Sequence, residues 1–323
     1  MASLREMRLH IRSVRNIAQV TRALQTVSAS KVRRAQAAVT ATRPYANKAL
    51  EVLDHLSDRR ASIHHPMLAL RPDPRGVMVI VVSGDRGLAG AYNSAVVRKA
   101  LQHAAGVQAP VHYLVVGRRG RDMLQRLGVP ITAEFSRLPP APSYADLSAI
   151  GRLAIDEFLG GKADRVDIVY TKFVNLMHQI PTVQQLLPIP ALSPADANRS
   201  EPAVERAGKV PGYIFEPGQT QLLDVVVNRL VTLEIYECIL ESLASEHAAR
   251  MVMMRNATEN ATELIHGLQL LYNKARQQNI TGDLLDIAAG TEALSAQTSS
   301  TPRSPSPGVR REKGMGDEAV NHR

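Results

Sequence analysis

Apolar residues recur at alternating spacings of three and four in two long stretches at opposite ends of the chain. One stretch runs from Pro217 to about Gly290, and the other covers roughly the first 55 residues. Heptad spacing sustained in this way is typical of helices that bury a common seam. We therefore expect the two terminal segments to form helices that wind round each other. The N-terminal seam slips near Leu24, where a stutter is expected. Its members are Leu4, Met7, Ile11, Val14, Ile17, Val20, Leu24, Val27, Val32, Ala35 and Val39, and those of the C-terminal seam are Leu223, Val226, Leu230, Leu233, Leu240, Ala244, Met251, Met254, Ala261, Ile265, Leu268, Tyr272 and Ala275, with Glu237, His247 and Thr258 as polar interruptions.

Between these helices, strand-like and helix-like segments alternate, which favours a small α/β domain with at least three neighbouring parallel strands. The expected strands are 77–82, 111–116, 131–136, 165–174 and 182–187, the last two antiparallel, and the expected helices are 94–105, 120–127 and 144–159. We expect a surface loop over 188–212 and a short strand over 213–216. The predicted organisation is a helix over 1–58, a connector over 59–75, an α/β domain over 76–216, a helix over 217–290 and a disordered tail over 291–323.

The positive charge is concentrated in the N-terminal helix. Residues 1–50 contain ten lysines and arginines and one acid, Glu6, so this segment carries the whole formal charge of +9. Nucleic-acid binding is one interpretation of such a stripe. However, the basic residues are not interleaved with aromatics, and they flank an apolar seam. An acidic protein surface explains them as well.

A glycine-rich turn follows the first expected strand, in the position where nucleotide-binding loops occur. It runs from Ser83 to Asn93, with glycines at 84, 87 and 90. This spacing is neither the dinucleotide fingerprint nor a P-loop. We interpret Gly84, Asp85, Arg86, Gly87 and Gly90 as a tight structural turn, in which Asp85 and Arg86 satisfy each other or a partner.

No other stretch has the pattern of a catalytic, cofactor or metal site. The single cysteine, Cys238, reads as a small, partly buried helix residue. His64 and His65 lie in a proline-flanked connector and are expected to be solvated. His247, on a seam position, is either a buried polar residue that sets the register of the coil or a tolerated mismatch. No run of 18 apolar residues suggests a membrane span. We expect no catalytic activity, no cofactor and no bound metal.

Three blocks of sequence resemble the γ subunit of F-type ATP synthases. They are residues 11–35, with Ile11-Arg12-Ser13-Val14-Arg15-Asn16 at their start, residues 83–93, and residues 250–277, which end in Leu268-Gln269-Leu270-Leu271-Tyr272-Asn273-Lys274-Ala275-Arg276-Gln277. The resemblance implies an antiparallel coiled coil of the two terminal helices, with a central Rossmann-like α/β domain at its base. It implies a rotor shaft that couples ion flow through the membrane sector to ATP synthesis without doing bond chemistry itself.

The same resemblance implies partners and contact residues. The partners would be the α and β subunits of the catalytic hexamer, the ε subunit and the membrane c-ring, with no nucleic acid and only indirect membrane attachment. Contacts with β are implied for Lys31, Arg33, Arg34, Arg250, Gln277, Thr281 and Asp283. The chain departs from the family pattern at Gly282, where a helix former is common, and in the tail from Ser295.

Two other classes remain open at this point: a nucleotide-binding α/β protein with a coiled-coil arm, and a basic coiled-coil nucleic-acid binder. Because the N-terminal segment reads as a structural helix rather than a transit peptide, we expect a peripheral location on the cytoplasmic side of a bacterial membrane.

Overall fold

A computed structural model describes residues 3–57, 65–69, 71, 73–189 and 219–299 of the chain. The chain divides into two compact units, one of residues 13–264 and the other of residues 1–12 and 265–323. Both long helices, α1 (Leu4–Ser57) and α5 (Gln219–Ser299), contribute residues to each unit.

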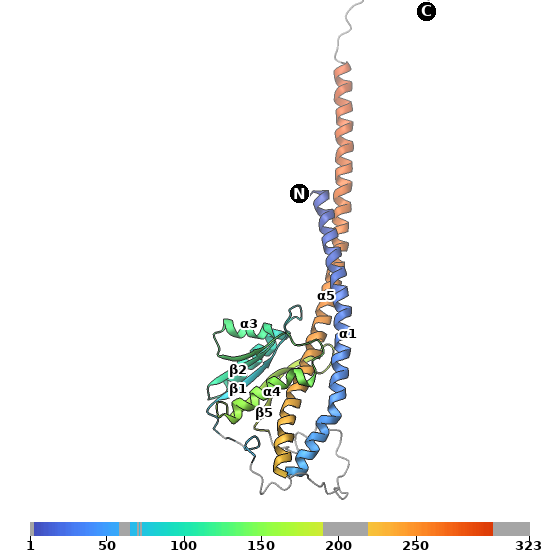
Figure 1. The fold of residues 1–323 in the computed structure, drawn as a ribbon. Helices are drawn as coiled ribbons and strands as arrows, with labels where there is room; N and C mark the ends of the chain where they lie inside the picture. The colour runs from blue at the N-terminus through green and yellow to red at the C-terminus, as the bar shows by residue number, and fades with distance from the viewer. Residues whose placement is uncertain (1–2, 58–64, 70, 72, 190–218, 300–323) are drawn as a thin grey trace, which may run out of the picture. The chain divides into compact units, whose positions relative to one another are not determined.

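The larger unit contains a five-stranded sheet with the order β3-β2-β1-β4-β5 (Figure 1). Its strands are β1 (Val77–Val82), β2 (Val111–Val116), β3 (Ile131–Phe135), β4 (Arg165–Phe173) and β5 (Gln179–Leu187). The first four are parallel to their neighbours, and β5 pairs antiparallel with β4. Both expectations for strand direction are confirmed, although β5 begins three residues earlier than Thr182.

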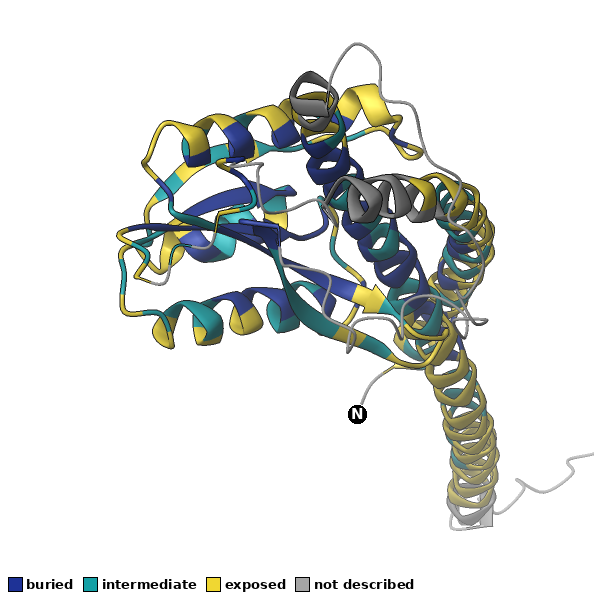
Figure 2. Ribbon diagram, turned by 90° about the horizontal axis from the view of Figure 1, so that it is seen from below, coloured by how far each residue is buried: buried dark blue, intermediate teal, exposed yellow. Residues whose placement is uncertain are grey.

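Helices cover both faces of this sheet, so β1 is buried along its whole length. On one face, α2 (Tyr92–Ala105) and α3 (Arg118–Arg126) pack against side chains such as Val79 and Val115. On the other face, α4 (Tyr144–Leu159) and the beginning of α5 pack against Ile80 and Ile168. Figure 2 shows the buried stretch of α5 beside the sheet.

The helix α4 begins at a capping box, because Ser143 accepts from the Asp146 amide and the Asp146 carboxylate accepts from the Ser143 amide. It approaches α5 closely at Gly151. A Cβ added there would come within 2.6 Å of the Thr232 hydroxyl oxygen. The missing side chain therefore lets α4 and α5 pack together on the sheet.

Within the larger unit, α1 and α5 are antiparallel (Figure 1). Thr21 bonds to Thr258 with 2.7 Å between their hydroxyl oxygens, and the later residue Lys31 of α1 lies near the earlier residue His247 of α5. The seam of α1 differs from the prediction. Ile17, Val20 and Val27 are 52–59% exposed, whereas Thr21 and Ser28 are buried. With Thr21 and Ser28 included, the heptad repeat of α1 continues without a stutter. These hydroxyl groups can be buried because each bonds to a carbonyl of its own helix and so loses no hydrogen bond.

The C-terminal helix is buried on a second face that the heptad pattern did not predict. Beside seam residues such as Leu230 and Leu240, the side chains of Val227, Ile235 and Cys238 are also buried, and these three belong to the core cluster under the sheet. This stretch of α5 is therefore both half of a coiled coil and part of the α/β core.

In the smaller unit, the Arg8 guanidinium lies 5.4 Å from the centre of the Tyr272 ring and donates a hydrogen bond to its hydroxyl. The helix α5 runs through Gly282 and Gly290 to Ser299. The predicted end at Gly290 is wrong, since nothing after this glycine stops the helix before residue 300. The remaining tail lies outside the described residues.

Several other expectations fall on the connector and the loop before α5. His65 is buried rather than solvated, and its Nε2 lies 2.9 Å from Asp224 Oδ1. The loop over 188–212 is described only as far as Ile189, and the strand over 213–216 lies outside the described residues. Across the described ranges, no helix has the length and apolar character needed to cross a membrane.

Candidate functional site

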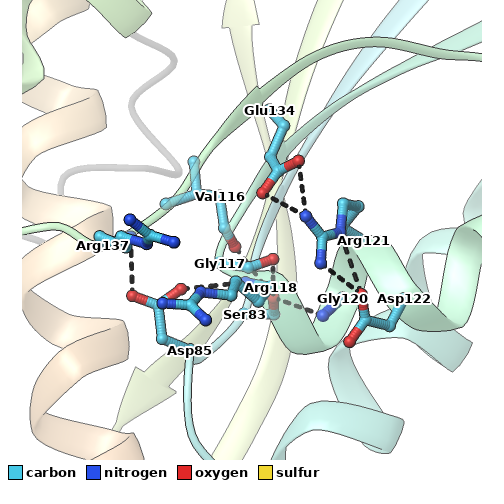
Figure 3. Close-up of polar contacts among 10 residues, drawn as sticks. All are labelled: Ser83, Asp85, Val116, Gly117, Arg118, Gly120, Arg121, Asp122, Glu134 and Arg137. Atoms are coloured by element: carbon cyan, nitrogen blue, oxygen red, sulfur yellow. Dashed lines mark hydrogen bonds and ion pairs between the residues drawn. The ribbon is translucent and has the colours of Figure 1, made fainter.

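The glycine-rich turn lies at the carboxyl ends of β1 and β2, where it is hydrogen-bonded to the beginning of α3 (Figure 3). Ser83 Oγ lies 2.9 Å from the Val116 carbonyl and accepts a bond from the Gly120 amide at 2.9 Å. Gly117 has φ of +94°, and a Cβ there would come within 2.2 Å of the Ser83 carbonyl oxygen. Glycine at this position therefore permits the close approach of the two loops.

The Asp85 carboxylate occupies the position that an anion would take at the N-terminus of α3. One of its oxygens accepts from the Arg118 amide at 3.0 Å, and the other accepts from the Arg137 amide at 2.9 Å (Figure 3). Amides at a helix N-terminus are the usual donors to a bound phosphate. Here a carboxylate of the chain itself uses one of them, which argues against a nucleotide site in this loop.

Arg121 strengthens the same edge of the sheet. Its guanidinium donates to both oxygens of Glu134 at 2.9 and 3.0 Å, and it also pairs with Asp122 (Figure 3). The hydrogen bonds from Arg121 lower the pKa of Glu134. These contacts join α3 to β3 beside the turn.

Strand order reverses at β1, so the crevice between the ends of β1 and β4 is where an open α/β sheet usually binds its ligand. In this protein, α5 fills part of that crevice with hydroxyl groups. The Tyr92 hydroxyl lies 2.7 Å from Ser242 Oγ, and Ser245 Oγ donates to the Thr171 carbonyl at 3.0 Å. Burial raises the pKa of Tyr92, and the charge of Glu246 raises it further.

A pair of opposite charges on α5 extends this contact to the glycine-rich turn. Glu246 and Arg250 form an ion pair, and their side chains are only 7% and 11% exposed. Arg250 Nε also donates to the Gly87 carbonyl at 3.2 Å, and Nη1 lies 3.1 Å from His247 Nδ1. A Cβ on Gly84 would come within 2.7 Å of the Glu246 carboxylate, so the backbone of the turn packs closely against this ion pair.

His247 is held neutral beside these charges. Burial lowers its pKa to about 4, and the positive charges of Arg250 and Lys31 act in the same direction. A neutral imidazole can accept a hydrogen bond from Arg250, which a protonated one cannot. The residue is thus a buried member of a polar cluster.

An apolar hollow of about 240 Å³ opens beside this cluster, between the turn, the β4–β5 hairpin and α5. Its lining includes Tyr92, Met177 and Met253, and among the residues described there it contains no lysine or arginine. Nucleotide sites need cationic or amide donors for phosphate and usually a larger volume. The described ranges also contain no group of three potential ligands that could hold a metal ion.

The other implied contact residues are placed differently from Arg250. Arg33 and Arg34 are exposed on α1 in the larger unit, and Lys31 is half-buried. In the smaller unit, Gln277, Thr281 and Asp283 are exposed on α5. Arg250 is the one whose side chain is largely buried within the chain.

The sequence interpretation found the turn but missed Ser242, Ser245 and Glu246, which hold it to the helix. One signal was available in the small residues Ser242, Ala244, Ser245, Ala248 and Ala249, because small side chains allow a helix to approach other backbone closely. Asp85 does not pair with Arg86 as one of the two predictions held. Its carboxylate accepts hydrogen bonds from the backbone amides of Arg118 and Arg137 instead.

These observations define an α/β domain built onto a two-helix coiled coil, in which α5 fills part of the usual ligand crevice. A family model described as ATP synthase matches residues 3–294. An ATP synthase gamma chain from Roseiflexus sp. (strain RS-1) is 43% identical over 298 residues, covering 91% of this chain and 99% of that protein. One from Dehalococcoides mccartyi (strain CBDB1) is 41% identical, covering 91% of this chain and all of that protein. The chain belongs to the family of ATP synthase gamma chains.

A solved structure has the same fold. It is the rotor of the Euglena gracilis mitochondrial ATP synthase in rotational state 1, with a TM-score of 0.58 and 21% identity. The match covers 86% of this chain and 98% of that one.

Proposed function

We propose that the chain is the central rotor shaft of an F-type ATP synthase and that it couples ion flow through a membrane sector to ATP synthesis in an αβ hexamer. It is a subunit without catalytic residues of its own. Its family membership supports this role, and so does the filling of the crevice between β1 and β4 by α5.

The observation that carries the proposal is the exposed apolar surface of α5 in the smaller unit. Large apolar side chains there are 51–72% exposed, a density that normally marks a surface covered by a partner. A shaft enclosed by a collar of other subunits would bury them. The residues are Leu270, Leu271, Ile280, Leu284, Leu285, Ile287 and Leu294.

We assign the partners from the family to which the chain belongs. The α and β subunits would surround the coiled coil, and the ε subunit and c-ring would contact the α/β domain. Arg33 and Arg34, with Lys31 behind them, would face acidic segments of β, and Gln277, Thr281 and Asp283 would contact β near the end of the shaft. Because exposed ion pairs are individually worth only about 0–1 kcal/mol, they would guide rotation rather than lock it. The complex would be bound peripherally to a bacterial membrane on its cytoplasmic side.

Mild detergent extraction of membranes, followed by purification through a tag on this chain, tests the proposal. We expect α and β subunits to co-purify in fixed ratio with the chain. Their absence would refute the shaft assignment. The nucleotide-binding alternative predicts instead that the isolated chain binds magnesium-ATP tightly and loses this binding on Asp85→Ala. The nucleic-acid alternative predicts salt-dependent DNA binding by residues 1–50.

A further inference from the structure

We infer that Arg250 and Glu246 are positioning residues that clamp the α/β domain to α5 and so carry torque between the domain and the coiled coil. This inference rests on the proposed shaft function and names the contact through which the force passes. It assigns Arg250 a role within the chain, in place of the contact with β that the family resemblance implies.

The first argument is directional. Apolar packing under the sheet holds α5 against the domain, but the hydrophobic effect itself has no preferred direction. Hydrogen bonds depend steeply on angle and distance. A torque about the axis of α5 would displace its surface sideways past the domain, and the bonds from Arg250 oppose that displacement.

The second argument is the path that the force would follow. Arg250 holds the Gly87 carbonyl, and the same turn is held to α2 and α3 on its other side. There, the Gly84 amide donates to Asn93 Oδ1 at 2.9 Å, and Asp85 accepts from the Arg118 amide. The turn therefore has anchors on opposite sides, so a load on Arg250 reaches the sheet without passing through a loose loop.

The third argument concerns side-chain chemistry. The planar guanidinium reaches Glu246, His247 and the Gly87 carbonyl with three different nitrogens. A lysine has a single ammonium nitrogen and cannot reproduce this geometry. Because both charges are buried, removing either one leaves the other without compensation, which makes the pair costly to break.

The chain supplies a matched control on the same helix. Arg255 and Glu259 form another arginine–glutamate pair at the same spacing of four residues, but their side chains are 67% and 60% exposed. Exposed pairs contribute little to stability. Arg255→Ala therefore removes the same kind of ion pair from α5 without removing a contact to the α/β domain.

The test measures ATP hydrolysis and ATP-driven ion pumping by the assembled complex in membrane vesicles. We expect Arg250→Ala to reduce the ions pumped per ATP hydrolysed, Arg250→Lys to restore this ratio partly, and Arg255→Ala to leave it unchanged. Reduced stability alone would lower hydrolysis and pumping in proportion. An unchanged ratio in Arg250→Ala would overturn the clamp.

Amide hydrogen exchange of the full-length chain gives an independent readout that does not require assembly. We expect Arg250→Ala to accelerate exchange of the Gly84 amide by roughly 100-fold or more relative to Arg255→Ala, as the loss of a buried ion pair implies. Equal exchange in the two variants would refute the clamp. Failure of the unmodified chain to assemble with a hexamer would instead refute the proposed function, and the exchange comparison would still decide the clamp.

Discussion

Replacing Gly151 by alanine tests whether close packing of α4 on α5 holds the domain to the shaft. The added Cβ would lie 2.6 Å from Thr232 Oγ1 and 3.1 Å from Thr232 Cβ. Thr232 cannot easily turn away, because its hydroxyl bonds to the Asn228 carbonyl at 3.0 Å and its side chain is buried. The two helices must therefore move apart.

The magnitude follows from two opposing effects. Alanine is favoured over glycine inside a helix by about 1 kcal/mol, whereas overpacking a tight core costs about 1–3 kcal/mol. We expect Gly151→Ala to lower the free energy of unfolding or leave it nearly unchanged. Gly282→Ala is the control, because nothing lies within 4 Å of the added Cβ. This control should gain about 1 kcal/mol, so the two variants should differ by about 1–3 kcal/mol.

The assay is denaturant unfolding of the full chain followed by far-ultraviolet circular dichroism. The double variant Gly151→Ala with Thr232→Ala adds a further check, because it removes the side chain that the new Cβ strikes. The double variant should therefore be nearly as stable as Thr232→Ala alone, because the side chain that the new Cβ would strike is absent. Equal free energies of unfolding for Gly151→Ala and Gly282→Ala would refute the packing argument.

Three further expectations concern the coiled coil and the tail. Replacing either Thr21 or Thr258 by valine should lower the free energy of unfolding by about 1 kcal/mol, and replacing both should cost less than the sum, as a double-mutant cycle would measure; strict additivity would exclude a coupled pair. Because the folded pKa of His247 lies at about 4, below its ordinary value of 6.5, the unfolded chain binds the proton more readily. The free energy of unfolding should therefore fall by about 3 kcal/mol as the pH drops from ~6.5 to ~4. Measured against pH, this free energy should change much less in His247→Gln. A slope that persists in the variant would assign the effect to another group. Ending the chain after Leu294 should leave co-purification with α and β unchanged, because the family match ends at residue 294 and the removed segment lies beyond it. Loss of the partners would assign the tail a role in assembly.

The regular elements could be predicted because each displays a direct signal in the sequence, either a period or a continuous apolar run. The continuous apolar, largely β-branched run from Val77 to Val82 is buried on both faces, and the helix from Tyr144 to Leu159 has the predicted bounds. The long C-terminal helix followed from its heptads, but its end did not, because Gly290 is tolerated inside the helix.

The seam of α1 was misread for a physical reason. The large apolar residues Ile17, Val20 and Val27 are exposed, whereas the small polar residues Thr21 and Ser28 are buried. Hydrogen bonds to helix carbonyls remove the penalty for burying these hydroxyls. Residue type alone therefore gives the wrong face of the helix here.

The candidate site could be predicted only in part. The glycine-rich turn is local and was recognised, but its contact with Glu246 and Arg250 joins segments that are far apart in the sequence. No periodicity encodes such a pairing. The polar residues Ser242 and Ser245 also read as ordinary surface positions until the sheet is placed against them.

Rotation of the chain inside an αβ hexamer tests the central claim most directly. Cys238 is the only cysteine and is buried, so an exposed position on the α/β domain, such as Arg126→Cys, can carry a probe selectively. With the hexamer fixed to a surface and magnesium-ATP supplied, we expect the probe to rotate in one direction. A probe that stays still while the hexamer hydrolyses ATP would contradict the assignment of this chain as the shaft.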